Sequence, residues 1–277
     1  MISDLHAAAR LPAVVRAISM RAESVGAEWV ICAGDVGAGG AVDTLRCLGE
    51  LDAACGRRLL YVPGNHDIWC SPGAPGDSWD QWKRLLTFPG NLERGNRALG
   101  AGLCAVGTGG WYDYSLAEPG PWTPADTERK SWGTARWRDA DFARWGAPDA
   151  EVCQALGRLL AERLHAARAA DLRPVVVTHV VPFAAAVQRR PEDALWSFCA
   201  AFLGSSRYGE GIVAAAAALA VFGHTHVRRH GTEAGVPYVC APLGYSQEWT
   251  HVKHPAAEVD LAMAIVDVEA GPGEARP

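Results

Sequence analysis

Five short segments of this chain carry side chains that commonly bind divalent metal ions. Together they supply three aspartates, one asparagine and five of the nine histidines: Asp4, His6, Asp35, Asn65, His66, Asp67, His179, His224 and His226. Carboxylate oxygens and neutral imidazole nitrogens suit hard or borderline divalent metals, and none of the segments offers a thiolate. So many candidate ligands exceed the tetrahedral set of a single zinc ion. They favour two adjacent ions that share a bridging carboxylate.

The spacing within the segments supports this interpretation. One residue separates Asp4 from His6, and one separates His224 from His226. In extended backbone, residues two apart point to the same side, so each pair can hold one ion together. Asp35 follows a glycine, which permits a sharp turn and a close approach of the backbone to the ions. Asp35 is therefore our candidate for the bridging ligand.

Four of the five segments come directly after a short apolar run. These runs, at residues 29–33, 59–63, 174–177 and 219–222, have the length and the Val, Ile and Leu content of buried strands. Ligands placed just past strand ends converge on one rim of a sheet, where α/β folds keep their sites. The pattern therefore predicts one site built at strand ends.

The N-terminal segment departs from this pattern because only Met1 and Ile2 precede Ser3. The residues before Asp4 span only about 10 Å at the rise of a strand. We expect the natural chain to begin further upstream, and Asp4 and His6 to be the least firmly held ligands.

Helical and strand-like patterns alternate over most of the chain. Apolar residues recur at helical spacing over 11–27, 42–55 and 149–170, and a short alanine-rich helix is predicted over 210–219. Further strands are predicted at the following ranges: 99–106, 236–241 and 261–268. The alternation indicates an α/β sandwich. We expect a single domain over residues 1–277, with a frayed Gly/Pro tail from about residue 270.

Residues 109–146 form a stretch of different composition that contains five tryptophans and has no clean period. So many aromatic residues argue against disorder, and we interpret the stretch as an ordered insert over the ligand rim. Trp111, Tyr112 and Tyr114 follow a predicted strand and could stack on a substrate. Ordinary packing beneath the insert explains them equally well, and the same two interpretations apply to Tyr245 and Trp249.

Composition narrows the class of protein. The chain has 49% hydrophobic residues, 21% charged residues and a net charge of -5. Basic pairs are scattered, which argues against nucleic acid as a partner. The longest apolar run, at 212–222, is too short to cross a bilayer, so no membrane partner is expected. Eight singly spaced cysteines and the lack of an apolar leader predict a cytoplasmic protein with reduced thiols. The oligomeric state stays open.

Taken in order, the five segments read DxH, GD, GNHD, H and GHxH, which resembles the calcineurin-like metallophosphoesterase family. The resemblance implies two packed mixed β-sheets flanked by helices, a four-layer αββα sandwich with a dinuclear metal site at the C-terminal strand ends. It implies Asp4, His6 and His226 as ligands of one metal and Asp35 as the bridge. It further implies that Asn65, His179 and His224 bind the second metal, that His66 is a general acid, and that Asp67 orients His66.

The expected activity is metal-dependent hydrolysis of a phosphomonoester or phosphodiester of a small organic molecule, by water activated between two divalent ions. Manganese, iron and zinc are the expected metals. One alternative is a non-catalytic, metal-containing protein-docking module, which would not need His66 and Asp67. Another is a protein phosphatase or nuclease of the same fold. The missing basic groove weakens the nuclease alternative.

Overall fold

The computed structural model describes residues 1–7 and 10–268. The main helices are α1 (Leu11–Ser24), α2 (Ala41–Ala54), α3 (Ser78–Leu85), α4 (Pro124–Glu128), α5 (Asp139–Phe142), α6 (Asp149–Ala169), α7 (Ala194–Cys199), α8 (Ser206–Ala214) and α9 (Pro255–Ala262). The strands are β1 (Val30–Cys32), β2 (Leu59–Tyr61), β3 (Arg97–Gly100), β4 (Leu103–Thr108), β5 (Ser131–Trp132), β6 (Ala135–Arg136), β7 (Arg173–Thr178), β8 (Leu219–Phe222), β9 (Arg229–Glu233) and β10 (Val236–Cys240).

The larger sheet has six strands in the order β3-β4-β7-β8-β10-β9. The four inner strands are parallel, and the two edge strands are antiparallel to their neighbours. Strands of a parallel sheet are covered on both faces, so they read as continuous apolar runs, as in β4, β7 and β8. This explains why their sequences were recognisable as buried strands.

The smaller sheet pairs β1 with β2 in parallel. The N-terminal segment lies beside it: Ile2 forms a bridge with Cys32, and Ser3 forms one with Pro242, just after β10. Met1 also exchanges two backbone hydrogen bonds with Ala264. The first residues of the chain are therefore held between β1 and the segments that follow β10 and α9.

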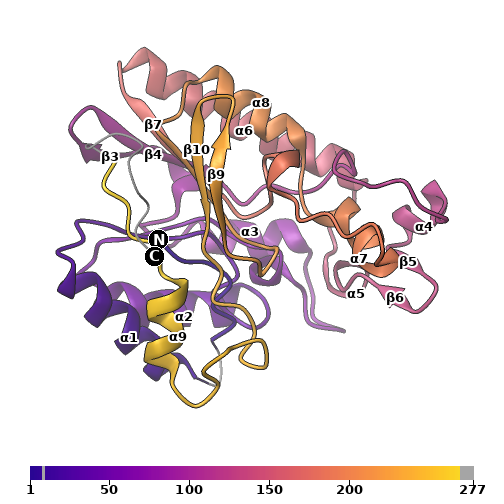
Figure 1. Ribbon diagram of the computed structural model, residues 1–277, viewed down its shortest axis with the longest axis horizontal. Coiled ribbons are helices and arrows are strands. Elements are labelled where there is room, and N and C mark those ends of the chain that lie inside the picture. Colours follow the sequence, from indigo (N-terminus) through magenta and orange to yellow (C-terminus); the bar gives the residue numbers. More distant parts are fainter. Residues whose placement is uncertain (8–9, 269–277) are drawn as a thin grey trace.

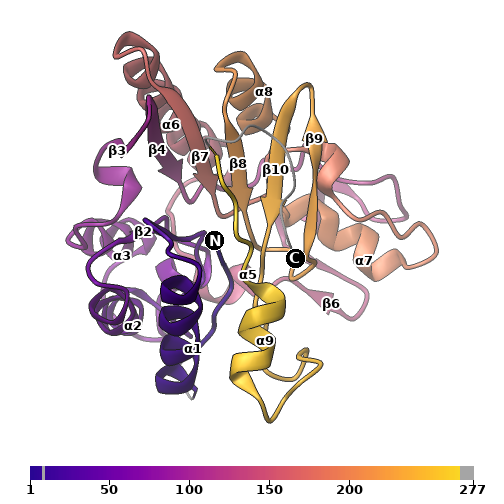
Figure 2. The same ribbon diagram turned by 60° about the vertical axis from the view of Figure 1, so that its left-hand side comes forward.

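Three hydrophobic clusters lie between the layers and join them. Helices α1, α2 and α9 pack on the outer face of the small sheet, and α6 and α8 cover the outer face of the large sheet (Figures 1 and 2). Between the sheets, alternate residues such as Ile31, Leu60, Val177 and Val221 form the inner core. The predicted sandwich of mixed sheets flanked by helices is confirmed.

Several element predictions need correction. Residues 99–106 form not one strand but the hairpin β3–β4, which turns at Ala101 and Gly102, both at positive φ. The helix predicted over 210–219 is instead α8, which begins and ends earlier because the chain must turn before β8. Strand β9 was missed because its sequence is polar and it lies at the sheet edge. The strand predicted over 261–268 is wrong: α9 continues to Ala262.

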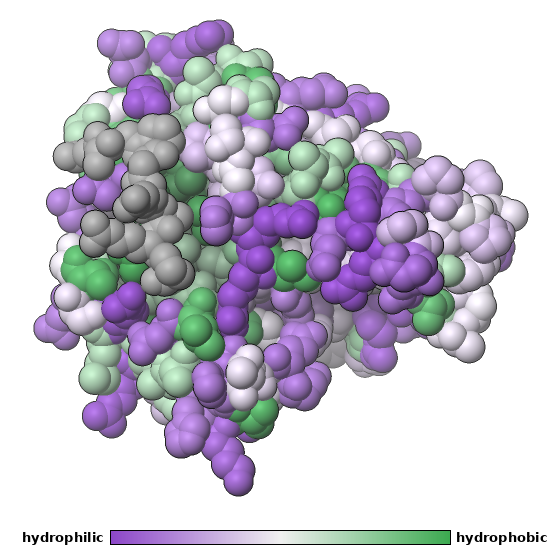
Figure 3. All heavy atoms as spheres, viewed as in Figure 1, coloured by the Kyte–Doolittle hydropathy of each residue, from purple (hydrophilic) through white to green (hydrophobic). Residues whose placement is uncertain are grey.

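The predicted frayed tail falls on residues 269–277, outside the described part of the chain. Among the described residues, every helix is too short or too polar to span a bilayer. The face seen in Figure 3 is largely hydrophilic, with hydrophobic side chains in small separate groups. Such isolated apolar side chains are normal on a folded surface.

The tryptophan-rich stretch is ordered and contains α4, the short hairpin β5–β6, and α5. Trp122 and Trp132 pack against Phe198 of α7, and Trp137 stacks on Phe202. The stretch therefore lies against the α7 region, at the side of the molecule labelled α4, α5, α7, β5 and β6 in Figure 1.

Candidate metal centre

The ligand segments follow the C-terminal ends of β1, β2, β7 and β8, together with the N-terminal segment. Several of their residues adopt left-handed backbone that non-glycine residues seldom adopt: Asp4, His6, Asp35, His224 and His226. Such strained backbone clusters at functional sites. Glycine is required at position 64, because a Cβ atom there would lie 2.0 Å from Asp35 Oδ1.

Two separate groups of side chains could each hold an ion, and a third, formed by His6, Asp35 and His66, overlaps both of them. In the first, His226 Nε2 lies 3.1 Å from His6 Nε2 and 3.5 Å from Asp4 Oδ1. In the second, His179 Nε2 lies 3.1 Å from His224 Nδ1 and 3.5 Å from Asp35 Oδ2.

Asp35 stands between the two groups. Its Oδ2 atom also lies 3.8 Å from His6 Nε2, and its Oδ1 atom accepts a hydrogen bond from the backbone of His66. One carboxylate oxygen therefore faces both groups, the position that a bridging ligand requires.

The N-terminal segment holds Asp4 firmly despite its length. The backbone amide of Asp4 donates to Gly34 O at 2.9 Å, and that of His6 donates to Asp35 O at 3.1 Å. The buried Asp4 carboxylate accepts from Ser3 Oγ and from the backbone amide of His224. These bonds tie the first metal-binding segment to the strand ends on both sides.

The electrostatics of the cluster fit divalent cations. Burial lowers the pKa of His6 to about 3 and that of His224 to about 4, so both imidazoles are neutral. Burial and nearby carboxylates raise the pKa of Asp35 well above its usual range. Within the described residues, His6 Nδ1 is buried and has no hydrogen-bond partner. Neutral histidine nitrogens therefore face one another beside buried aspartates. A divalent metal ion stabilises such an arrangement because it supplies the positive charge.

His226 differs from the other histidines. Burial alone would lower its pKa, but hydrogen bonds to Asp4 and Glu248 outweigh burial and raise the pKa to about 10. Glu248 Oε2 lies 2.8 Å from His226 Nδ1. A carboxylate on the outer nitrogen of a metal-binding histidine orients the ring and fixes its tautomer.

Asn65 and His66 follow β2. Asn65 Oδ1 lies 3.2 Å from His179 Nε2, while its Nδ2 donates to Asp139 Oδ1 at 2.9 Å. Asp139 of α5 thus turns the amide oxygen of Asn65 toward the second group. The His66 ring stacks on Trp69 at 3.6 Å, and its Nε2 lies 3.9 Å from Asp35 Oδ2.

Comparison with known proteins assigns this arrangement to a family. The family model of the calcineurin-like phosphoesterases, which describes their shared sequence pattern, matches residues 1–228, most of the chain. The chain belongs to the calcineurin-like phosphoesterase family. It is therefore a hydrolase acting on phosphoric ester bonds, and its family uses a dinuclear divalent metal site. No curated protein matches it in sequence.

Two solved structures share the fold of this calcineurin-like phosphoesterase. A phosphopantetheinyl hydrolase from Mycobacterium tuberculosis is 22% identical with a TM-score of 0.63, and 91% of each chain is covered. A dimetal phosphatase from Danio rerio is 13% identical with a TM-score of 0.50, covering 86% of this chain and 85% of that chain. At these identities the likeness concerns the fold alone.

Asp67 of this phosphoesterase does not fit the orienting role predicted for it. Its carboxylate is fully buried and accepts hydrogen bonds from six groups: the backbone amides of Asp35, Val36, Gly37 and Gly64, and the hydroxyls of Thr44 and Tyr61. The group beside the His66 imidazole is instead the hydroxyl of Tyr245, 3.2 Å from Nε2. Asp67 therefore stabilises the loops after β1 and β2.

The predicted substrate contacts of Trp111, Tyr112 and Tyr114 do not fit either. Trp111 and Tyr112 are 1% and 0% exposed, and Trp111 and Tyr114 hydrogen-bond to Asp149. Tyr112 donates to Asp139. Trp111 and Tyr112 belong to the hydrophobic core and Tyr114 packs against it, so packing, the alternative interpretation, describes them.

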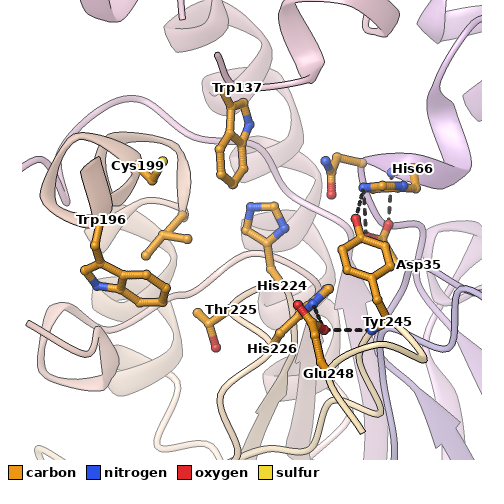
Figure 4. A pocket seen from close by; sticks show the side chains of 12 residues that line it. Asp35, His66, Trp137, Trp196, Cys199, His224, Thr225, His226, Tyr245 and Glu248 are labelled. Carbon is orange, nitrogen blue, oxygen red and sulfur yellow. Dashed lines mark hydrogen bonds and ion pairs between the residues drawn. The ribbon is translucent and has the colours of Figure 1, made fainter. Parts of the chain in front are cut away.

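Other aromatic residues border the site. A cavity of about 260 Å³ opens over the ligands (Figure 4), and its walls beyond them include Trp137, Trp196, Leu203 and Tyr245. The sequence left the roles of Tyr245 and Trp249 open. Tyr245 lines the cavity, whereas Trp249 is buried. Trp196 and Leu203 could not be recognised as cavity walls from the sequence, because neither directly follows a recognisable motif. Trp137 belongs to the tryptophan-rich stretch, whose composition was the only indication.

Proposed function

We propose that this phosphoesterase hydrolyses a phosphomonoester or phosphodiester of a small organic molecule with the help of two divalent ions, manganese, iron or zinc. The position of Asp35 carries the proposal, because its Oδ2 lies within 4 Å of a histidine from each ligand group. We place the protein in the cytoplasm, where its eight thiols stay reduced.

In this proposal Asp4, His6 and His226 would hold one ion, Asn65, His179 and His224 would hold the other, and Asp35 would be shared between them. When bound, two divalent ions lower the pKa of a water molecule and neutralise charge on the phosphoryl oxygens. The protein supplies rigid ligands, since Asp4 and Asp35 are buried and hydrogen-bonded to neighbouring backbone.

His66 is the proposed proton donor to the leaving oxygen. Its ring is held between Trp69, on which it stacks, and the Tyr245 hydroxyl. Burial, followed by the neighbouring histidines, lowers the pKa of His66 below its usual range. An anionic phosphoryl group beside the ring opposes this effect, because it stabilises the protonated imidazole.

The test is hydrolysis by the purified protein reconstituted with Mn²⁺, screened on nucleotides, sugar phosphates, phosphodiesters and phosphopantetheinyl esters. The last class is included because a phosphopantetheinyl hydrolase shares the fold. Asp35→Ala should lose both ions and all turnover. His66→Ala should keep both ions and lose roughly two to four powers of ten in rate, the range for general acid–base catalysis.

Metal analysis and turnover measurements together distinguish the bridging role of Asp35 from the proton-donor role of His66. Retention of two ions per chain by Asp35→Ala would contradict the bridging role. Unchanged turnover by His66→Ala on a substrate with a poor leaving group would contradict the proton-donor role. Protein phosphatase or nuclease activity without small-molecule turnover would contradict the proposed substrate class.

A further inference from the structure

Two cavities meet at the same pair of side chains. One, the tryptophan pocket, has a volume of about 260 Å³ and is bordered by Trp137, Trp196 and Leu203. The other, the Arg138 pocket, has a volume of about 370 Å³ and is bordered by Trp69, Phe142 and Arg138. His66 and Tyr245 line both cavities. Space for a substrate therefore extends in two directions from the proposed proton donor.

The tryptophan pocket has rigid apolar walls. Trp137 Nε1 donates to Asp139 at 2.8 Å, and Trp196 Nε1 donates to Gln188 O at 2.6 Å. The guanidinium carbon of Arg190 lies 4.0 Å from the centre of the Trp196 ring. Because both indole N–H groups bond within the protein, the rings present their apolar faces to the cavity.

The charges of this pocket disfavour a second phosphate. Its lining residues, all within the described chain, include the carboxylate of Glu248 but no lysine or arginine. A phosphate group outside the metal cluster would therefore find no lysine or arginine among the lining residues to pair with. The occupant that suits these walls is an uncharged aromatic or aliphatic group.

The Arg138 pocket leads the other way. Trp69 stacks on His66 with its ring centre 3.6 Å away and on Phe142 at 4.8 Å, and Arg138 lies 5.0 Å from the Phe142 ring centre. The stack forms a continuous wall from the proposed proton donor to an exposed cation. A second substituent on phosphorus could follow this wall.

We propose that the substrate is a phosphodiester, with one apolar arm in the tryptophan pocket and the other along Trp69 and Phe142 toward Arg138. This inference rests on the proposed function. A monoester has one arm and would fill only one of the two cavities. Hydrolysis forms a P–O bond from water and breaks the P–O bond to one arm. The products are a phosphomonoester and an alcohol, which takes up one proton.

The first measurement is binding, which does not depend on turnover. Diphenyl phosphate and phenyl phosphate are titrated into the Mn²⁺-loaded protein, and binding is followed by quenching of tryptophan fluorescence. We expect the diester to bind at least about tenfold more tightly, the effect of one well-packed aromatic arm. Equal binding, or tighter binding of the monoester, would overturn the inference.

The second measurement is turnover of bis(p-nitrophenyl) phosphate and p-nitrophenyl phosphate, which share a leaving group. We expect kcat/KM to favour the diester by at least about tenfold. A preference for the monoester would overturn the inference and leave the proposed function intact. Hydrolysis of neither ester, with two ions bound, would count against the proposed function, and the binding result would still decide the inference.

Trp196 provides the variant test. Trp196→Ala should raise KM for the diester about tenfold with little change in kcat, because it removes a wall of the pocket but no ligand. Trp196→Leu gives a second variant that preserves more of the packing. Trp29→Ala is the control, since Trp29 precedes β1 and lines neither cavity. An unchanged KM in both Trp196 variants, with native circular dichroism, would overturn the placement of the apolar arm.

Discussion

Asp35 and Asp67 show how the neighbouring groups that a buried carboxylate contacts decide its role. Asp35 directs Oδ2 at histidines of both ligand groups. Asp67, bonded to the Asp35 backbone amide at 2.9 Å, turns both of its oxygens toward loop backbone and hydroxyls. A buried acceptor that satisfies six donors is structural, because its removal would leave those donors unpaired.

Asp67→Ala should therefore lower the free energy of unfolding by at least about 3 kcal/mol, as expected when a buried hydrogen-bond network is broken. Urea unfolding measures the change. Asp43→Ala is a matched control, since that carboxylate pairs with Arg46 at the surface and should cost below about 1 kcal/mol. Unchanged stability of Asp67→Ala with a loss of activity alone would restore the orienting role.

Two buried histidines predict how the metal-free protein responds to acid. The pKa values of His6 and His224 are lowered to about 3 and about 4, so the unfolded chain takes up protons first as the pH falls below about 6.5. Their contribution to stability is complete above that pH and declines below it. We expect a loss of roughly 1–2 kcal/mol per histidine between pH 6.5 and pH 5.

Urea unfolding of the metal-free protein at both pH values measures this loss. His224→Gln should reduce it, whereas His165→Gln, at an exposed position of α6, should not. Equal losses in wild type and His224→Gln would contradict the prediction.

At the scale of elements, helix α5 joins the tryptophan-rich stretch to the metal centre. The buried carboxylate of Asp139 accepts hydrogen bonds from Asn65, Trp69, Tyr112 and Trp137. A proposed metal ligand, the residue stacked on His66 and a wall of the tryptophan pocket are thus fixed by one side chain.

Asp139→Ala should weaken Mn²⁺ binding about 10–100-fold, the usual effect of losing a group that orients a metal ligand. Calorimetric titration measures the affinity, and tryptophan emission should shift because Trp69 and Trp137 lose their acceptor. Asp141→Ala is the control on the same helix, since its carboxylate bonds to Arg136 near the surface. Unchanged Mn²⁺ affinity in Asp139→Ala would exclude the coupling.

On the scale of the whole molecule, the proposed ligands come from both sides of the sandwich. Asp35 and Asn65 follow strands of the small sheet, whereas His179 and His224 follow strands of the large sheet. Ions bound between them would link the two sheets, in addition to the inner hydrophobic core. Metal binding should therefore stabilise the whole fold, because it favours the native state only.

Chelation with EDTA should lower the Tm by at least about 5 °C, since one ion at a hundredfold excess over its Kd stabilises by about 2.7 kcal/mol. Differential scanning calorimetry with and without Mn²⁺ measures the change. Asp35→Ala should not respond to EDTA. A wild-type Tm that is independent of metal would contradict the link between the sheets.

Much of the fold could be predicted from sequence because its signals are local. Buried parallel strands are short apolar runs, and α1, α2 and α6 have one apolar face each. Where the signal was weak or misleading, the prediction failed: β9 is polar at a sheet edge, and apolar residues at the end of α9 resembled a strand. Metal ligands are equally local signals, because side-chain type and spacing within a segment decide what can bind an ion.

The sequence by itself therefore determined which residues could form the metal centre and that strand ends would bring them together. Only the tertiary structure decided what surrounds them. Tyr245, Trp196 and Asp139 reach the centre from distant segments, and Trp111 turns away into the core. The physical reason is that the direction and partners of a side chain depend on which segments pack together, and spacing along the chain does not specify this packing.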